Sequence, residues 1–474
     1  ARYMSMSGAF GALGGDISSL RNNPAGIGVY RSSDFSITLG GIVTNVAGKW
    51  ENKWGYQNQY NSTLNSVGYV MNIKPDDKYG SGILNSNFAI SYNKLNNFNR
   101  AIYLKSGNAQ NTSITQYFGE FTTGLTETNL KKTDTYEPYN NVNVPWLSVL
   151  AYDAYMINPD ESEPTVWHSL LAEGQTVTPT YEANERGNID EWAFSYGANF
   201  NDNFYLGVAL GIQSVDYTLT SKYAESFTGG GNMQLVNNFN TSGSGINLKL
   251  GAIFRPVSFL RFGLAFHTPT IYNLTDTYKS TLYYPALAIN NNVSGYANTP
   301  TATNTYTLLT PLKANISGAV VFSKLGLISL EYELTNYTGM ALSDNNGVGF
   351  IDENQGIITY LKDSHTIKLG GELKIIPNFA LRGGWAYTSP ATSSDARKLL
   401  PLNTTRTDTE YFLDKGTSYY SGGIGYREGN WYFDVAYLLK NTNQDFYAYN
   451  FAGASVANIS TKSNNIVCTF GFKF

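Results

Sequence analysis

The side chains of this chain that could do chemistry are few and scattered. The residues 344–355 begin like a calcium loop, but Val348 and Gln355 stand at the fifth and twelfth positions, where oxygen ligands are needed. We interpret this stretch as a polar external turn. The three histidines lack the spacing of metal ligands; they are His168, His267 and His365. No phosphate-binding Gly-Lys-Ser/Thr motif occurs, and no Ser–His pair can be named, so we expect no metal, no cofactor and no enzymatic activity.

Three basic side chains are candidates for binding a carboxylate on a ligand: Lys249, Arg255 and Arg261. They fall in segments that we predict to be strands, where an inward-facing cation could meet a bound anion. The alternative is that each cation pairs with an acidic residue on a neighbouring strand. The sequence does not choose between these interpretations.

A second candidate site is apolar and lies in the longest predicted loop, 99–190. The stretch 145–157 begins with Pro145, which suits a first helical turn, and 164–172 is followed by Gly174 as a possible helix cap. Two short helices here could form an apolar groove that captures a ligand; packing of the two helices on each other is the alternative. The residues of the proposed capture surface are Trp146, Leu147, Leu150, Tyr155, Met156, Trp167, Leu170 and Leu171.

The segment 464–474 indicates which elements must position these residues. Its side chains alternate, with Ile466, Cys468, Phe470, Phe472 and Phe474 on one face and polar or small residues on the other. A strand has a side-chain period of two, and eleven residues suffice for a tilted strand to cross a bilayer. An apolar strand that ends in Phe is typical of the last strand of a bacterial outer-membrane barrel.

Thirteen further segments alternate in the same way, which predicts an all-β, 14-stranded antiparallel transmembrane β-barrel over 34–474. Short connections are expected on the periplasmic side and long ones outside, at about 45–65, 99–190, 219–244, 269–310, 339–364, 389–417 and 441–463. The predicted strands are 34–44, 66–73, 87–98, 191–200, 204–218, 245–255, 259–268, 311–323, 327–338, 365–376, 379–388, 418–427, 431–440 and 464–474.

The charged residues of these strands occupy one of the two alternating faces, and we predict that this face lines the lumen. In 327–338, Ile328 and Leu330 point outward while Glu331 points inward; in 379–388, Leu381 points outward and Arg382 inward. A basic side chain facing lipid at mid-bilayer would cost roughly 2–4 kcal/mol. A soluble sandwich or propeller would not need this consistency.

Composition agrees with a barrel. Tyr 36, Phe 25 and Gly 46 are abundant, and charged residues make up only 14% of the chain. The net charge of -4 gives no reason to expect nucleic acid as a partner. The chain starts at Ala1 without an apolar signal segment, from which we expect a mature protein of the bacterial outer membrane whose export signal has been removed.

The first 33 residues are small and turn-rich rather than strand-like. Gly8, Ala9, Gly11, Gly14 and Asp16 precede the sequence Asn23-Pro24-Ala25-Gly26, directly before the first predicted strand. This pattern resembles the FadL-type family of outer-membrane transporters for long-chain fatty acids and other hydrophobic compounds. The resemblance implies that residues 1–33 form a hatch, or plug, inside the lumen, with gating residues Phe10, Asn23, Pro24, Ala25 and Gly26.

The resemblance also implies a function: passive uptake of a hydrophobic small molecule, by capture on the loops, passage into a lumen pocket and sideways exit through the barrel wall. In that family the capture groove comes from the third and fourth external loops, whereas the apolar stretch here lies in the second. The expected partners are such a ligand, outer-membrane lipid and lipopolysaccharide. The alternatives are an accessory barrel of a secretion or surface complex, which binds protein partners through its external loops, and an open diffusion porin.

Overall fold

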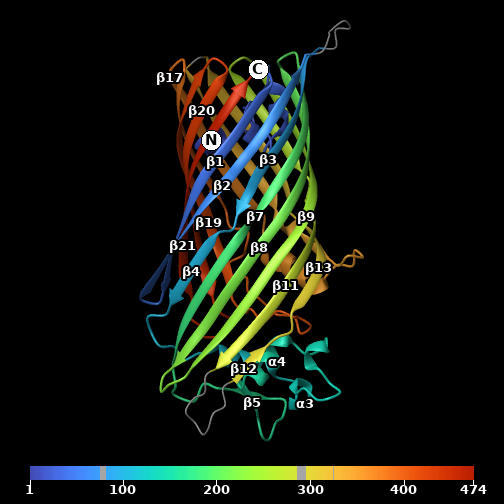
Figure 1. Cartoon of the computed structure of the whole chain (residues 1–474), viewed down its shortest axis with the longest axis vertical. Coiled ribbons are helices and arrows are strands. Elements are labelled where there is room, and N and C mark those ends of the chain that lie inside the picture. Colours follow the sequence, from blue (N-terminus) through green and yellow to red (C-terminus); the bar gives the residue numbers. More distant parts are fainter. Residues whose placement is uncertain (75–81, 285–294, 324) are drawn as a thin grey trace.

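The computed structural model describes residues 1–74, 82–284, 295–323 and 325–474, and in these ranges the chain is dominated by one antiparallel sheet (Figure 1). Parts of three predicted connections, at 75–81, 285–294 and 324, lie outside the described residues. The strands of the sheet are β1 (Asp34–Trp50), β2 (Lys53–Ile73), β3 (Ile83–Asn97), β4 (Arg100–Lys105), β7 (Val177–Phe200), β8 (Phe204–Phe227), β9 (Asn232–Val257), β10 (Leu260–His267), β11 (Ile271–Tyr284), β12 (Gly295–Asn298), β13 (Ala302–Leu309), β14 (Leu312–Phe322), β15 (Gly326–Asn336), β16 (Ala341–Ser343), β17 (Ser364–Ile376), β18 (Phe379–Thr388), β19 (Tyr411–Glu428), β20 (Trp431–Tyr447) and β21 (Ala457–Lys473).

The sheet closes on itself because β1 pairs with β2 on one side and with β21 on the other. Four wall strands are interrupted: β3 continues as β4, β10 as β11, β12 as β13 and then β14, and β15 as β16. The pieces of each set follow one another along the wall and therefore count as one strand. Within the described residues the barrel thus has 14 antiparallel strands, as the sequence predicted.

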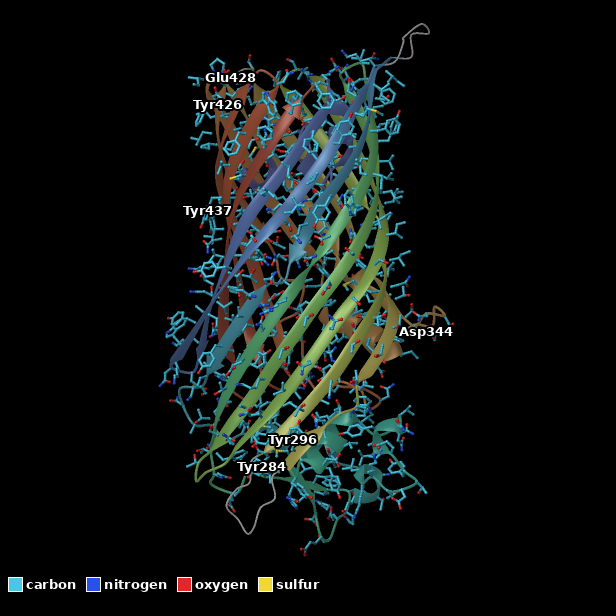
Figure 2. All side chains as sticks on the ribbon, viewed as in Figure 1. Tyr284, Tyr296, Asp344, Tyr426, Glu428 and Tyr437 are labelled. Atoms are coloured by element: carbon cyan, nitrogen blue, oxygen red, sulfur yellow. The ribbon has the colours of Figure 1, made fainter. Side chains whose placement is uncertain are left out.

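The predicted faces of the wall are confirmed. Ile328, Leu330 and Leu381 are exposed on the outside, whereas Glu331 and Arg382 are buried on the inside. The same exposed apolar belt continues around the barrel through aromatic residues such as Tyr437, which projects from the outer wall in Figure 2. Such a belt is what a strand wall needs in order to contact lipid.

Several strands extend far beyond this belt, which corrects the predicted loops. The loop predicted at 45–65 is the tip of the β1–β2 hairpin, and the loop predicted at 219–244 consists of the ends of β8 and β9. β9 has 26 residues, although about 10 suffice to cross a bilayer. The extensions of β8 and β9 were predicted as loops because their outward residues are polar.

The loop 106–176 folds into a helical cap at the end of the barrel opposite the termini (Figure 1). No helix in the described ranges is long and apolar enough to cross a membrane. The helices and the separate hairpin of the chain are α1 (Arg2–Ser5), η1 (Ile17–Ser19), η2 (Pro24–Val29), α2 (Ile114–Thr122), α3 (Glu127–Leu130), η3 (Pro138–Asn140), α4 (Trp146–Asp153), β5 (Ile157–Pro159), β6 (Trp167–Ser169), η4 (Tyr337–Gly339) and α5 (Ile351–Tyr360).

Of the two helices predicted in this loop, the first is confirmed and the second is wrong. α4 begins directly after Pro145, as expected. The stretch 164–172 instead contains β6, which pairs with β5 as a small hairpin. The side chain of Asp160 accepts hydrogen bonds from the backbone N–H groups of Ser162 and Glu163, at 2.8 and 2.9 Å, and so fixes the turn between these strands.

Candidate functional site

The leading segment, residues 1–33, lies inside the barrel and packs against its inner wall. Phe10 and Met6 are almost fully buried in a cluster that includes Ala319 of β14. Further along, Ile17 and Ile27 pack against Val70 of β2 and Ala89 of β3. Small inward-facing residues on the wall make room for this segment.

The Asn-Pro-Ala-Gly turn of the leading segment is held by Asn23. Its Oδ1 accepts a hydrogen bond from the Ala25 N–H at 3.0 Å, which caps η2. Its Nδ2 donates to the carbonyl oxygen of Gly11 at 2.6 Å and, at 3.3 Å, to that of Ala252 in the wall. One side chain therefore joins the turn to the preceding loop and to β9.

Wall glycines allow the turn to approach the sheet directly. A Cβ atom at Gly251 would lie 2.0 Å from Asn23 Oδ1, and one at Gly207 would lie 2.3 Å from the backbone of Pro24. Pro24, Ala25 and Gly26 are buried against these positions. The five predicted gating residues, Phe10 and Asn23 to Gly26, thus all lie at the inner wall; a gating role stays a prediction.

Buried charges link the leading segment to the wall. Glu331 of β15, with no exposed surface, accepts hydrogen bonds from the Gly11 N–H at 2.7 Å and from Asn22 Nδ2 at 2.8 Å. It also receives Lys368 Nζ at 2.8 Å. Near the start of the chain, Arg2 Nε lies 2.7 Å from Glu372. Charge-assisted hydrogen bonds of this kind are among the stronger ones in proteins.

The three predicted carboxylate partners are not gathered in one place. Lys249 is paired with Glu191, its Nζ lying 2.5 and 2.7 Å from the two carboxylate oxygens. Arg261 donates to the carbonyl oxygen of Leu13 at 2.9 Å and so supports the leading segment. Arg255 is half-buried in β9, close to the turn that leads to β10. Lys249 therefore pairs with an acidic residue, but Glu191 lies on β7, two strands away from β9, and not on a neighbouring strand.

Two lumen cavities lie between the leading segment and the cap. The first has a volume of about 310 Å³ and contacts both the leading segment and the walls. The second, about 630 Å³, lies beside it, and Thr44, Lys440 and Ser463 line both. Asn, Thr and Ser predominate on the walls of both cavities, which therefore suit the polar part of a ligand better than a plain hydrocarbon.

The first cavity is lined by three cations. Its walls include Arg21, Lys94 and Lys440 but no carboxylate among the described residues. Lys94 is paired with Asp190, 3.1 Å away. Arg21 lies over the ring of Tyr3, 4.9 Å from the ring centroid. Arg21 and Lys440 are thus the cations best placed to meet an anion, and neither was predicted.

The ladder of backbone hydrogen bonds in the wall is interrupted where it borders this cavity. The β2–β3 ladder stops at the pair Ser66 and Asn93, whereas the β1–β2 ladder continues to Lys53. Beyond Asn93 the third wall strand bulges between Lys94 and Asn96, and its continuation β4 pairs with β7. No β2 ladder with β3 or β4 occurs over 53–65 in the described structure. We call this region the β2–β3 seam.

The sequence already indicates an irregularity at the β2–β3 seam. Residues 93–99 read Asn-Lys-Leu-Asn-Asn-Phe-Asn, where the alternation of the preceding strand is lost. Such a loss is typical of a bulge or a strand end. For Arg21 and Lys440 no local signal exists, because they lie 419 positions apart (440 minus 21) and meet only when the barrel closes.

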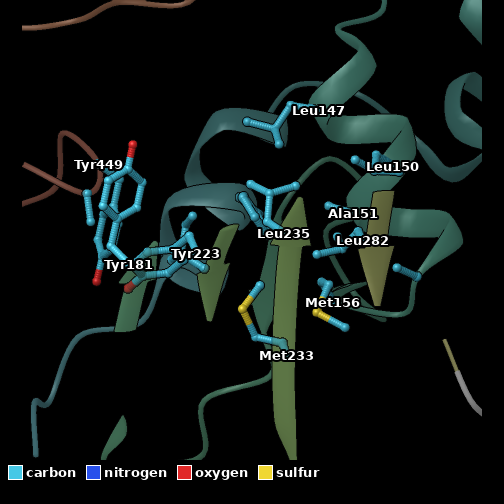
Figure 3. Close-up of a cluster of buried hydrophobic side chains, with 14 of the residues drawn as sticks. Leu147, Leu150, Ala151, Met156, Tyr181, Tyr223, Met233, Leu235, Leu282 and Tyr449 are labelled. Atoms are coloured by element: carbon cyan, nitrogen blue, oxygen red, sulfur yellow. The ribbon is translucent and has the colours of Figure 1, made fainter. Parts of the chain in front are cut away.

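The predicted capture surface lies in the cap, where it forms part of a closed core (Figure 3). Leu147, Leu150, Met156 and Trp167 are buried against strand ends such as Leu235 and Leu282. Trp146, Leu170 and Leu171 are partly buried at its edge, and Tyr155 is 57% exposed. These residues are brought together, as predicted, but they pack on the barrel end and on one another; ligand capture by them stays a prediction.

A buried acid holds the cap on the barrel and should make it sensitive to pH. Glu225 of β8 accepts hydrogen bonds from Ser113 Oγ at 2.5 Å and from the Ile114 N–H at 2.8 Å, at the start of α2. Burial raises the pKa of the Glu225 carboxyl from 4.5 to about 7.

Because this pKa is raised in the folded state, the stabilising contribution of Glu225 is complete below about pH 4.5 and is lost as the pH rises through 7. We expect faster amide exchange in α2 at pH 8 than at pH 5, after correction for intrinsic rates. In Glu225→Gln, which stays neutral, this pH difference should disappear. An unchanged difference in Glu225→Gln would contradict the assignment.

Comparison with known proteins identifies the fold. No family model and no curated protein sequence matches the chain. Among solved structures, a FadL homologue of Pseudomonas aeruginosa aligns with 100% of this chain and 98% of its own, at 13% identity and a TM-score of 0.55. This chain has the FadL-type fold. The toluene transporters TbuX of Ralstonia pickettii (12% identity, TM-score 0.52) and TodX of Pseudomonas putida (11%, 0.51) also align over 100% of this chain and 97% of theirs.

Proposed function

We propose that this FadL-type barrel lies in the bacterial outer membrane and takes up, without an energy source, a hydrophobic small molecule that carries an anionic head, such as a long-chain fatty acid. The observation that carries the proposal is the cationic cavity beside the β2–β3 seam. The exposed apolar belt supports placement in a membrane, and the solved structures of similar fold include transporters of toluene.

In this mechanism Arg21 and Lys440 hold the head group of the ligand, while its apolar tail extends through the seam. Each CH₂ group that stays out of water contributes about 0.8 kcal/mol, so a sideways path into the bilayer avoids re-solvating the tail. The leading segment closes the lumen below the cavity, and its movement would connect the cavity to the seam. Arg21 belongs to that segment, so ligand binding and movement of the segment would be coupled.

Binding of oleate tests the head-group site. We expect Lys440→Met and Arg21→Met each to weaken oleate binding by about tenfold, because a charge-assisted hydrogen bond contributes about 1.5–3 kcal/mol. Oleyl alcohol, which has no charge, should bind equally to all variants. The exposed Lys462→Met serves as the control. Equal oleate affinity in Lys440→Met, Arg21→Met and the unmodified protein would refute the site.

Photolabelling tests the route. A palmitate with a diazirine near its methyl end should, on illumination, label residues 56–65 of β2 and 94–102 of β3 and β4. Labelling confined to the cap would contradict sideways exit. In planar bilayers the protein should conduct almost no ions, since the leading segment fills the lumen; steady porin-like conductance would favour a diffusion pore instead.

A further inference from the structure

The outward side chains of β8, β9, β11 and β13 change abruptly from apolar to polar where these strands extend beyond the apolar belt. These four strands run side by side (Figure 1). The last apolar row across them is Ile212, Ile246, Ile271 and Leu309, which are paired in register. Two residues further along, the row is Ser214, Ser244, Asn273 and Thr307. On all four strands the outward side chains thus change from apolar to polar over two residues, which marks the boundary between hydrocarbon and polar surroundings.

Beyond that boundary the outward positions form a regular polar array. At the alternating positions of 214–220, 238–244, 273–279 and 303–307 every residue is Ser, Thr or Asn, except Asp216 and Lys279. One row, for example, is Thr218, Asn240, Thr277 and Thr303. Rows repeat about every 7 Å along the strands, and neighbours lie about 4.8 Å apart across them. We call this surface the hydroxyl face.

The chemistry of the hydroxyl face fits uncharged sugars. A hydroxyl group both donates and accepts hydrogen bonds, and so does a side-chain amide, which matches the alternating donors and acceptors of a glycan. Some neighbours bond to each other, as Asn240 Nδ2 does to Thr218 Oγ1 at 3.1 Å, but each group keeps further capacity. With one Lys and one Asp, the face lacks the cluster of cations that a phosphate would need.

An exposed aromatic pair lies at the far end of the same face. Tyr283 of β11 is paired in register with Tyr296 of β12, and their ring centroids are 6.3 Å apart. Tyr296 is 61% exposed and lies at the end of the barrel near the cap (Figure 2). Exposed tyrosine rings with one apolar side and a polar hydroxyl group suit contact with the faces of sugar rings.

We propose that the hydroxyl face binds the sugar chain of lipopolysaccharide in the outer leaflet. The position indicates the source of the sugar. The face begins directly above the apolar belt and extends away from it, so the neutral sugars of a glycan anchored in the same leaflet lie along it. This inference rests on the outer-membrane placement proposed above but not on transport.

The test uses the full chain in detergent and two fluorescent probes, lipopolysaccharide with a complete core oligosaccharide and lipid A, which lacks the core. We expect the core-bearing probe to bind about tenfold more tightly than lipid A, because several neutral hydrogen bonds add to the acyl contacts. The triple variant Thr218→Val, Thr277→Val, Thr303→Val keeps β-branched shapes and removes three hydroxyl groups. It should lose most of that preference and bind lipid A unchanged.

A matched control replaces three exposed or half-exposed threonines of the cap, in Thr126→Val, Thr128→Val, Thr133→Val, and should keep the preference. Equal binding of both probes to the unmodified protein, or an undiminished preference in the triple variant, would overturn the hydroxyl face as a sugar site. Failure to bind either probe would likewise overturn the hydroxyl face as a sugar site. Loss of oleate uptake would not affect this conclusion.

Discussion

Valine in place of Gly251 or Gly207 is expected to displace the Asn23–Gly26 turn from the barrel wall. A Cβ at Gly251 would lie 2.0 Å from Asn23 Oδ1 and 2.8 Å from the Ala25 nitrogen; at Gly207 it would lie 2.3 Å from the carbonyl carbon and oxygen of Pro24. Backbone atoms cannot move aside as a flexible side chain can. Overpacking of this kind costs about 1–3 kcal/mol or more.

The measurement is the rate of amide hydrogen exchange in residues 23–29. We expect this rate to rise by about tenfold to a hundredfold, which corresponds to the free energy of overpacking. Ion conductance in a planar bilayer should rise in parallel, because the lumen is less completely filled. Gly318→Val is the matched control: it lies in β14, and no atom lies within 4 Å of its added Cβ. Exchange at the unmodified rate in both variants would show that the turn does not need these glycines.

Removal of the Glu331 carboxylate is expected to destabilise the barrel strongly. Glu331→Ala leaves the Gly11 N–H and Asn22 Nδ2 without their acceptor and deprives Lys368 of one of two partners, the other being Glu333 at 2.9 Å. Breaking a buried charge network from one side typically costs about 3–5 kcal/mol.

Unfolding in urea from lipid vesicles, followed by tryptophan fluorescence, measures this loss. Glu331→Gln should lie between the unmodified protein and Glu331→Ala, since its amide oxygen can still accept one hydrogen bond. The control is Glu182→Ala, which removes an exposed pair with Lys222 and should cost less than about 1 kcal/mol. A Glu331→Ala midpoint equal to that of the control would contradict the anchoring role.

The two sets of variants separate two ways in which the leading segment is held. The glycines provide space, so their substitution acts on the position of the turn and leaves the wall charges paired. Glu331 provides hydrogen bonds and charge, so its removal acts on the stability of the wall and the segment together. If the segment moves during uptake, the glycine variants should alter oleate uptake more than their effect on barrel stability suggests.

The alternation of side chains was sufficient to predict the barrel wall. Ile328, Leu330 and Glu331 lie on the predicted faces because a membrane imposes one rule on every strand: apolar outward, charges inward. This rule is local, with a period of two, and can be seen within ten residues. The turn at Asn23 and Pro24 was equally visible, since its conformation depends on neighbouring residues.

The same rule failed where the membrane ends. The extensions of β8 and β9 have polar outward residues and aromatic inward ones such as Tyr223, so they were predicted as loops. The stretch 164–172 was predicted as a helix from its apolar residues. It contains a strand instead, because the turn fixed by Asp160 brings it into pairing with β5. Such short segments have weak preferences, and their tertiary contacts outweigh them.

By itself, the sequence determined the strand phases, the closure into a barrel and the segment able to enter the lumen, because each follows from contacts between residues near in the chain or from the surrounding lipid. Only the tertiary structure decided which cations remain without a carboxylate. Lys249 meets Glu191 across 58 positions, whereas Arg21 and Lys440 face a cavity that forms only when the ends of the chain are brought together. Charge pairing depends on distances across the lumen, and those distances are set by closure of the whole sheet.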